Sequence, residues 1–171
     1  MIKLEYLLPE DYNNIVKWNE GKSQDFLYQW AGPWYKFPIT EIQLAERFQN
    51  KANRFESDVF VFKIVMSKSN EMIGTIELFK IDRENKTATA GKFLIDENKR
   101  GLGIGKLALE QLVKIGFNEL GLNTIKLNVF DFNVRAIRCY ESVGFVKTTF
   151  TEKVWEADEG FWNCVGMEIS R

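Results

Sequence analysis

Three glycines alternate in the segment Arg100–Lys106 (RGLGIGK), which lies between a strand-like run and a helix-like run. Glycine lets successive backbone N–H groups point toward one anion, and the N-terminus of the following helix adds the positive end of its dipole. Arg100 and Lys106 place cationic side chains beside the turn. The segment therefore predicts a cradle for a diphosphate, the simpler alternative being a tight strand-to-helix turn without a ligand.

The turn fits two nucleotide-binding motifs poorly. A Walker A loop requires glycine where Arg100 stands, and Ser or Thr where Leu107 stands. A dinucleotide-binding GxGxxG/A pattern matches residues 103–108, but no Asp or Glu follows about 20 residues later. The turn also follows several strands, rather than the first strand of a βαβ unit. A nicotinamide-dependent oxidoreductase is therefore only the weaker alternative.

The residue types present exclude several catalytic devices. The chain has no histidine and two cysteines, Cys139 and Cys164. It therefore lacks a Ser-His-Asp or Cys-His nucleophile, a histidine-ligated metal and a CxxC pair, and no metal is expected. A disulfide between the two cysteines is the less favoured alternative to free thiols. Catalysis must rely on Tyr, Asp, Glu, Lys, Ser, Thr or backbone amides, and the substrate can supply the nucleophile.

Two blocks resemble one known family. The pattern Arg100-x-x-Gly-x-Gly is similar to the (Gln/Arg)-x-x-Gly-x-(Gly/Ala) motif of the GNAT superfamily, the acetyl-CoA-dependent N-acetyltransferases. Downstream, residues 133–145 (NVRAIRCYESVGF) resemble that family's N-x-x-A-x-x-x-Y-x-x-x-G-F block. The match covers roughly residues 60–150, and the layout resembles the branch that acetylates ribosomal-protein N-termini, spermidine and small amines.

The resemblance implies acetyl-CoA as the cofactor. Backbone amides of residues 101–106 would hold its pyrophosphate, and the strand ending at Phe93–Ile95 would pair with the pantetheine arm. An amide near Leu94 would donate to the thioester carbonyl oxygen. The cofactor-binding residues expected on this basis are Phe93, Leu94, Ile95, Arg100, Gly101, Leu102, Gly103, Ile104, Gly105, Lys106, Asn133, Ala136 and Tyr140.

Tyr140 is the expected general acid, because its phenol can donate a hydrogen bond or proton to the departing sulfur. Without the family context, Tyr140 would be interpreted as a core residue of an amphipathic helix with Ala136 and Val143. Asn133 is expected to hold the cofactor arm or a water molecule, and it is also a good helix N-cap.

The general base stays unassigned. Family members often carry a carboxylate where this chain has Thr89. Glu77 is a candidate replacement, and Asp82, Glu20 and Asp25 lie near expected acceptor loops. The simpler interpretation of each carboxylate is a charged side chain exposed to solvent. A chain of water molecules could also deprotonate the amine.

The stretch 26–37 (FLYQWAGPWYKF) is half aromatic and contains a Gly-Pro turn. It falls where related enzymes place an acceptor loop between the first two helices. Aromatic faces can bind a cationic amine, but the rings can equally pack in the core or at a subunit contact. Trp30, Trp34 and Tyr35, with Glu77, form the expected substrate-binding set, and the aromatic surplus suggests a homodimer.

The elements that must position these residues follow from hydrophobic periodicity and turn signals. Thr40 and Gln43 form a capping box for a helix through about Asn50. Strands are predicted over 2–8, 59–66, 72–81, 87–96, 124–130, 145–155 and 161–169, and helices over 11–18, 40–50, 103–120 and 133–143. The order β-α-α-β-β-β-α-β-α-β-β predicts a mixed α/β (α+β), GNAT-like fold, with helices flanking a mostly antiparallel sheet.

Composition sets the remaining bounds. With 171 residues, of which 45% are hydrophobic, we expect a single acetyltransferase domain over residues 1–171. A net charge of −1 gives no field for nucleic acid or an anionic membrane, and the N-terminus lacks the pattern of a signal peptide, so a cytoplasmic location is expected. The predicted activity is direct acetyl transfer to a primary amine: a small amine, a polyamine or a protein N-terminus. The alternative is a non-catalytic acetyl-CoA-binding module.

Overall fold

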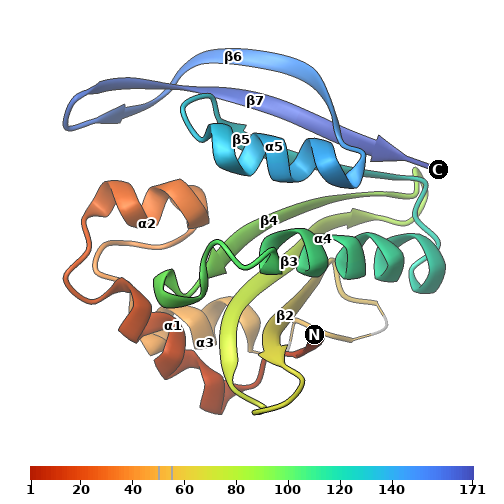
Figure 1. Ribbon diagram of the computed structural model, residues 1–171, viewed down its shortest axis with the longest axis horizontal. Coiled ribbons are helices and arrows are strands. Elements are labelled where there is room, and N and C mark those ends of the chain that lie inside the picture. The colour runs from red at the N-terminus through yellow and green to blue at the C-terminus, as the bar shows by residue number, and fades with distance from the viewer. Residues whose placement is uncertain (50, 55) are drawn as a thin grey trace.

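The computed structural model describes every residue except 50 and 55, and it contains one seven-stranded sheet (Figure 1). The strands lie in the order β1-β2-β3-β4-β5-β7-β6, and all neighbours are antiparallel except β4 and β5. Their bounds are Ile2–Tyr6 (β1), Val59–Met66 (β2), Met72–Asp82 (β3), Thr87–Ile95 (β4), Thr124–Phe130 (β5), Val146–Ala157 (β6) and Gly160–Ser170 (β7). The predicted fold class and antiparallel meander are confirmed.

Five α-helices pack around this sheet in the described part of the chain. They are Tyr12–Asn19 (α1), Gln24–Ala31 (α2), Glu41–Phe48 (α3), Ile104–Lys114 (α4) and Val134–Val143 (α5). A π-helical turn, Ile115–Glu119, continues α4. None of the described helices is long and apolar enough to cross a membrane.

Helix α2 differs from the sequence expectation, which treated residues 26–37 as a loop. The Ser23 side chain accepts a hydrogen bond from the Phe26 amide and caps the helix. Leu27 and Ala31, four residues apart, are buried on one face. The aromatic stretch therefore begins on a helix. The predicted cap at Thr40 is confirmed by a 3.3 Å bond from the Gln43 amide, whereas residue 50, the predicted end of that helix, lies outside the described residues.

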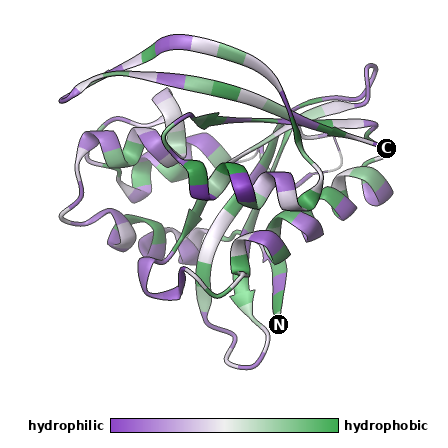
Figure 2. Cartoon of the chain, turned by 45° about the horizontal axis from the view of Figure 1, so that its top comes forward, coloured by the Kyte–Doolittle hydropathy of each residue, from purple (hydrophilic) through white to green (hydrophobic). Residues whose placement is uncertain are grey.

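Each face of the sheet carries its own core. One core joins β1–β5 and β7 to α4 and α5, and includes Ile76, Leu112 and Ile125. The other joins β2 to α1, α2 and α3, and includes Ile15 and Leu44. Figure 2 shows hydrophobic residues gathered on the central strands, and hydrophobic and hydrophilic residues alternating along α4 and α5. The central strands are thus buried on both sides.

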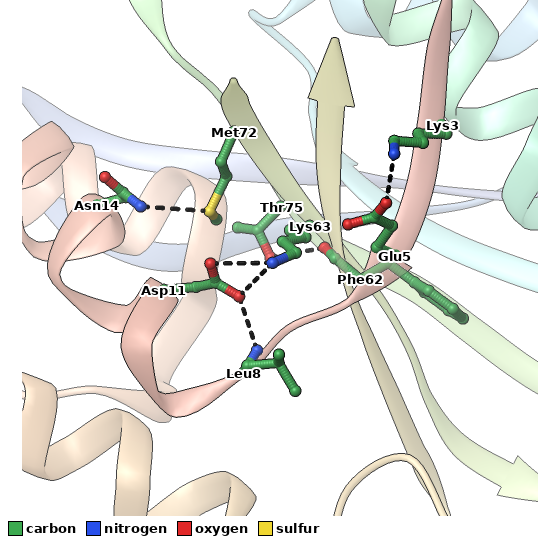
Figure 3. A network of polar contacts seen from close by, with 9 residues as sticks. All are labelled: Lys3, Glu5, Leu8, Asp11, Asn14, Phe62, Lys63, Met72 and Thr75. Atoms are coloured by element: carbon green, nitrogen blue, oxygen red, sulfur yellow. Dashed lines mark hydrogen bonds and ion pairs between the residues drawn. The ribbon is translucent and has the colours of Figure 1, made fainter. Parts of the chain in front are cut away.

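A small polar network fixes the start of α1 to the sheet (Figure 3). The Asp11 carboxylate accepts a hydrogen bond from the Leu8 amide at 2.9 Å and pairs with the Lys63 ammonium at 2.9 Å. Beside it, the buried Thr75 hydroxyl donates to the Phe62 carbonyl at 3.1 Å. Because buried polar groups need partners, these contacts hold the short 3-10 helix Pro9–Asp11 (η1), β2 and β3 in one arrangement.

A β-bulge interrupts β4 at Lys92. Glu77 on β3 pairs with Gly91 and Thr75 pairs with Leu94, so Lys92 and Phe93 together oppose Ile76. Lys92 has a φ of 44°, in the left-handed region that side chains seldom adopt. The extra residue shifts the alternation of the side chains that follow it. Phe93 and Ile95 accordingly pack on the core of α4 and α5, while the Lys92 side chain lies on the other face, against Phe79.

Candidate active site

A groove opens where β4 and β5 separate. The two strands pair only from Thr87 with Thr124 to Thr89 with Lys126. Farther along, β4 continues with β3, and β5 continues with β7. The resulting cavity has a volume of about 590 Å³, and its lining runs from the glycine turn and α5 to the aromatic residues of α2. The groove is therefore a product of sheet geometry rather than of a loop.

The glycine turn forms one end of this groove. Gly101 and Gly103 have φ values of 87° and 74°, and Gly103 is the N-cap of α4. A Cβ at Gly103 would meet no atom within 4 Å, so the backbone there faces open space. The Arg100 Nε donates to the Ile95 carbonyl at 3.1 Å, which ties the turn to the end of β4. The turn thus exposes backbone at a helix N-terminus, and its use as an anion cradle stays a prediction.

Cationic side chains surround the turn. Those that line the groove, apart from Lys92, are Lys99, Arg100, Lys106, Arg135 and Arg138. Among the described lining residues there is no Asp or Glu. This end of the groove therefore suits a ligand with several negative charges, because cations and helix N-terminal amides both favour anions.

Helix α5 and its N-cap place Tyr140 and Asn133 in the lining of the groove. The Asn133 side chain accepts a hydrogen bond from the Ala136 amide at 3.2 Å, so it caps the helix as predicted. Burial raises the pKa of the Tyr140 phenol above its ordinary value of 10.0, and neighbouring Cys139 adds to the effect. Tyr140 is therefore protonated at neutral pH, and no described residue hydrogen-bonds its hydroxyl in this structure.

Aromatic rings of α2 and β5 form another part of the lining, which we call the aromatic end. Phe26, Trp30 and Phe130 line the groove there, and the Trp30 indole donates to Asn19 at 3.0 Å. Behind Phe130, the ring of Tyr28 stacks on Trp155 with centroids 3.6 Å apart. This end can hold an apolar group or an amine that contacts ring faces.

Most of the residues predicted from the sequence meet in this groove. Every predicted cofactor-binding residue lines it except Leu102, whose side chain is exposed. Of the predicted substrate-binding set, Trp30 lines it. Trp34, Tyr35 and Glu77 do not, because they lie among α3, β3 and the segment after α2 on the other face of the sheet.

Glu77 is engaged in ion pairs rather than open to a substrate. Its carboxylate is 2.8 Å from Arg47 and 3.7 Å from Lys92. The other carboxylates considered as bases also lie outside the lining: Asp25 accepts from the Trp155 indole at 2.9 Å, Asp82 binds Asn85, and Glu20 borders a separate cavity of about 200 Å³.

Several lining residues were not anticipated from the sequence. They include Phe26, Gln29, Phe130, Arg135 and Arg138, and several residues of the strands that form the walls of the groove. Arg135 and Arg138 lie inside the second motif block, so cations at variable positions of that block were the available signal. Phe130 is the last residue of a strand that its alternating pattern predicted correctly. Its position beside α2, however, depends on tertiary packing.

Comparisons with known proteins identify the family of the chain. The chain matches the model of the Acetyltransferase (GNAT) family over residues 24–145. It is 32% identical over 117 residues to the SPbeta prophage-derived uncharacterized N-acetyltransferase YokL of Bacillus subtilis, covering 67% of this chain and 64% of that protein. It is 32% identical over 74 residues to a spermine/spermidine N(1)-acetyltransferase of the same organism, covering 43% and 49%. The first three curated relatives are matched over 62% to 65% of their own length.

Solved structures share the fold. A spermidine N-acetyltransferase from Vibrio cholerae, determined in complex with CoA and spermine, superposes with a TM-score of 0.84 at 19% identity, covering 99% of this chain and 95% of that one. At this level of identity the likeness establishes the arrangement of elements. Together with the matched family model, it leads to one conclusion: the chain belongs to the GNAT family of acetyltransferases.

Proposed function

We propose that this protein is an acetyl-CoA-dependent N-acetyltransferase that transfers acetyl to a primary amine by direct attack. The observation that carries the proposal is the groove between β4 and β5, which joins a candidate anion cradle, a half-buried phenol and an aromatic end in one cavity. Family membership supports the same activity. Neither histidine nor a protein thiol is needed for it, because the substrate amine is the nucleophile.

The lining of the groove fits acetyl-CoA, which supplies an activated acetyl thioester when bound. Its diphosphate and further phosphate require several cations and free amides, and the turn at Gly101–Lys106 offers both. Its slender arm requires an apolar channel, and the walls contain Leu94, Leu127 and Val129. The space around the Gly103 backbone is open, since an added Cβ would meet no atom within 4 Å.

In the proposed reaction, the chain orients the reactants and stabilises charge. Amides of the glycine turn bind the diphosphate, and a backbone amide near Leu94 donates to the carbonyl oxygen that becomes negative during attack. The Tyr140 hydroxyl donates to the departing sulfur, and its raised pKa keeps that donor protonated. Holding both reactants in one groove lowers the entropic part of the barrier.

The proton of the attacking amine leaves through water in this proposal. None of the described lining residues is a carboxylate, and Glu77 is held by Arg47 and Lys92. Water molecules that reach the groove can relay the proton to solvent without a dedicated side chain. The aromatic end, with Phe26, Trp30 and Phe130, would receive the carbon skeleton of the amine.

A thiol-release screen tests this proposal. Purified protein is mixed with acetyl-CoA and one member of each of four acceptor classes: a polyamine, an aminoglycoside, a peptide with a free N-terminus and a small metabolite amine. Amine-dependent release of free thiol is the expected result. Acetyl-CoA binding by calorimetry without turnover of any acceptor would instead identify a binding module, and absence of binding would refute the cofactor assignment.

We also infer a cytoplasmic location and association of copies of this chain, of which a homodimer is the simplest form. Cys139 and Cys164 are free thiols, which suits a reducing compartment. The outer strand β6 exposes Val146 and Phe150, and one structural neighbour, a spermidine N-acetyltransferase of Vibrio cholerae, is described as dodecameric. Light scattering on the purified protein measures the assembly.

A further inference from the structure

The bulge in β4 holds a lysine in an unfavourable backbone conformation beside the groove. Lys92 has a φ of 44°, and it immediately precedes Phe93–Ile95, which line the cavity. An L-residue in this region persists only when its surroundings impose it. We therefore expect the contacts of the Lys92 side chain to hold the bulge in place.

The Lys92 ammonium is buried in a polar and aromatic pocket. The residue is 5% exposed, and its Nζ lies 3.7 Å from the Glu77 carboxylate. The same atom lies 3.6 Å from the ring centroid of Phe79 and 4.7 Å from that of Trp34. Ring faces attract cations, so two kinds of contact hold this side chain on the face opposite α4.

The contacts continue to helix α3. The Arg47 guanidinium lies 2.8 Å from the Glu77 carboxylate and stacks over Trp34 at 4.5 Å. One buried carboxylate thus lies between two cations, and the aromatic faces compensate the excess positive charge. We call Arg47, Glu77 and Lys92 the ionic clamp. It joins α3, β3 and the bulge of β4.

Strands β3 and β4 approach each other closely just beyond the clamp. A Cβ at Gly74 would lie 2.5 Å from the Leu94 carbonyl oxygen, so β3 and β4 approach closely just after the bulge. Any shift of the bulge would therefore move the backbone of Phe93–Ile95 relative to the groove. On the other side of that segment, β5 no longer pairs with β4 and cannot restrain it.

We propose that Lys92 is a positioning residue, which acts through the ionic clamp to hold the groove-lining backbone of Phe93–Ile95 in the geometry required for acetyl transfer. This inference rests on the proposed function and adds a residue that does not touch the reactants. Trp34 and Glu77, which the sequence suggested for the acceptor site, support the reaction from the opposite face of the sheet.

Steady-state kinetics of three variants test the role. Lys92→Met removes the charge and keeps an unbranched chain, and we expect kcat to fall at least tenfold with the KM for acetyl-CoA changed less than threefold. Lys92→Arg restores the cation and should return kcat to within threefold of wild type. Arg47→Met breaks the outer end of the clamp and should lower kcat at least threefold. Should Lys92→Met fail to fold, Arg47→Met decides the outcome.

Hydrogen–deuterium exchange on the ligand-free protein separates this inference from the proposed function. Peptides covering residues 90–96 should exchange at least tenfold faster in Lys92→Met than in wild type. Lys80→Met is the matched control, because Lys80 also has a positive φ but is exposed on β3. Unchanged exchange, or unchanged kcat in both clamp variants, overturns the inference. Faster exchange in Lys92→Met, combined with a wild-type protein that shows no transferase activity, would refute the proposed function alone.

Discussion

Tyr140 is the groove residue that best suits a proton donor. Its phenol is buried enough to have a raised pKa, it lies in the lining, and no described residue satisfies its hydroxyl. Cys139, its neighbour, also has a pKa raised by burial and therefore stays a neutral thiol at pH 7. Because the chain has no histidine, few other side chains could donate the proton. A substitution of Tyr140 is therefore a direct test of the proposed acid.

Tyr140→Phe should therefore lower kcat about 100-fold, the usual contribution of a positioned general acid, because only the hydroxyl is lost. Thiol release measures turnover, and calorimetry should give an acetyl-CoA Kd within twofold of wild type. Tyr6→Phe, at an exposed tyrosine of β1, is the control for the same chemical change. Full activity of Tyr140→Phe at every pH would exclude the residue as the acid.

The sequence predicted the groove residues that belong to motifs, and missed those that tertiary packing supplies. The glycine turn, Asn133 and Tyr140 were found because their types and spacing have a local reason. Phe130 was missed, because its position beside α2 depends on the separation of β4 and β5. Glu77 was assigned to the substrate on chemical type alone, and its partner Arg47 is 30 residues away in sequence.

At the scale of elements, the glycine turn combines a backbone requirement with a ligand site. Gly103 and Gly121 are matched in conformation, with φ values of 74° and 68° and no atom within 4 Å of an added Cβ. Gly103 begins α4 at the groove, whereas Gly121 follows the π-helical turn at the other end of that helix. Substitutions at the two glycines should therefore strain the backbone equally, whereas only a substitution at Gly103 can affect a ligand in the groove.

Gly103→Ala and Gly121→Ala should each lower the free energy of unfolding by about 1 kcal/mol, because alanine is strained at positive φ. Only Gly103→Ala should also weaken acetyl-CoA binding, by at least tenfold, since its methyl group would enter the cradle. Urea denaturation and calorimetry measure the two effects. Equal loss of affinity in both variants would argue against a cradle at Gly103.

The β6–β7 hairpin contacts α2 and supports the aromatic end without lining the groove. Asp25 accepts hydrogen bonds from the Trp155 indole at 2.9 Å and from the Asp158 amide at 3.2 Å. Sequence patterns gave no indication of this contact, which spans more than a hundred residues. The helix itself was hidden because aromatic residues weaken the helical signal of a short segment, and the Ser23 cap was the clue that could have revealed it.

Asp25→Ala should loosen the hairpin without disturbing the cradle. We expect the KM of an active amine to rise about tenfold, with the acetyl-CoA Kd unchanged, because Tyr28 and Trp155 would lose their fixed stack beside Phe130. The comparison variant is Ser23→Ala, which removes the cap of α2 but not the hairpin contact. An unchanged amine KM in Asp25→Ala would remove the hairpin from the acceptor site.

At the scale of the whole molecule, the groove lies along a seam in the sheet. The β1–β4 meander and the β5–β7 group meet through three residue pairs of β4 and β5, and α4 and α5 bridge them on one face. Hydrophobic periodicity predicted both groups of strands correctly. It could not predict where they separate, since a strand buried on both faces has the same pattern whether its edge is paired or open.

The ionic clamp, which lies beside that seam on the β3–β4 side, also gives the protein's stability a distinctive pH dependence. Burial lowers the pKa of Lys92 to about 8 from 10.5. Between these values the unfolded chain holds a proton that the folded chain has lost, so stability rises with pH in this window. The effect is about 2 kcal/mol from pH 7 to pH 9.5. Above pH 10 the trend reverses, because burial raises the pKa of Tyr35 and Tyr140 and only the unfolded chain ionises them.

Urea denaturation of wild type and Lys92→Met at half-unit steps from pH 7 to pH 11 should therefore give curves that diverge. Wild type should gain stability relative to the variant above pH 8, because methionine has no proton to release, while both should lose stability together above pH 10. Lys80→Met should follow wild type closely, since its side chain is exposed and its charge is the smallest of the effects on the Lys92 pKa. Parallel curves for wild type and Lys92→Met would mean that the Lys92 ammonium is as well stabilised in the folded protein as in water, and that its ion pair and ring contacts fully offset its burial.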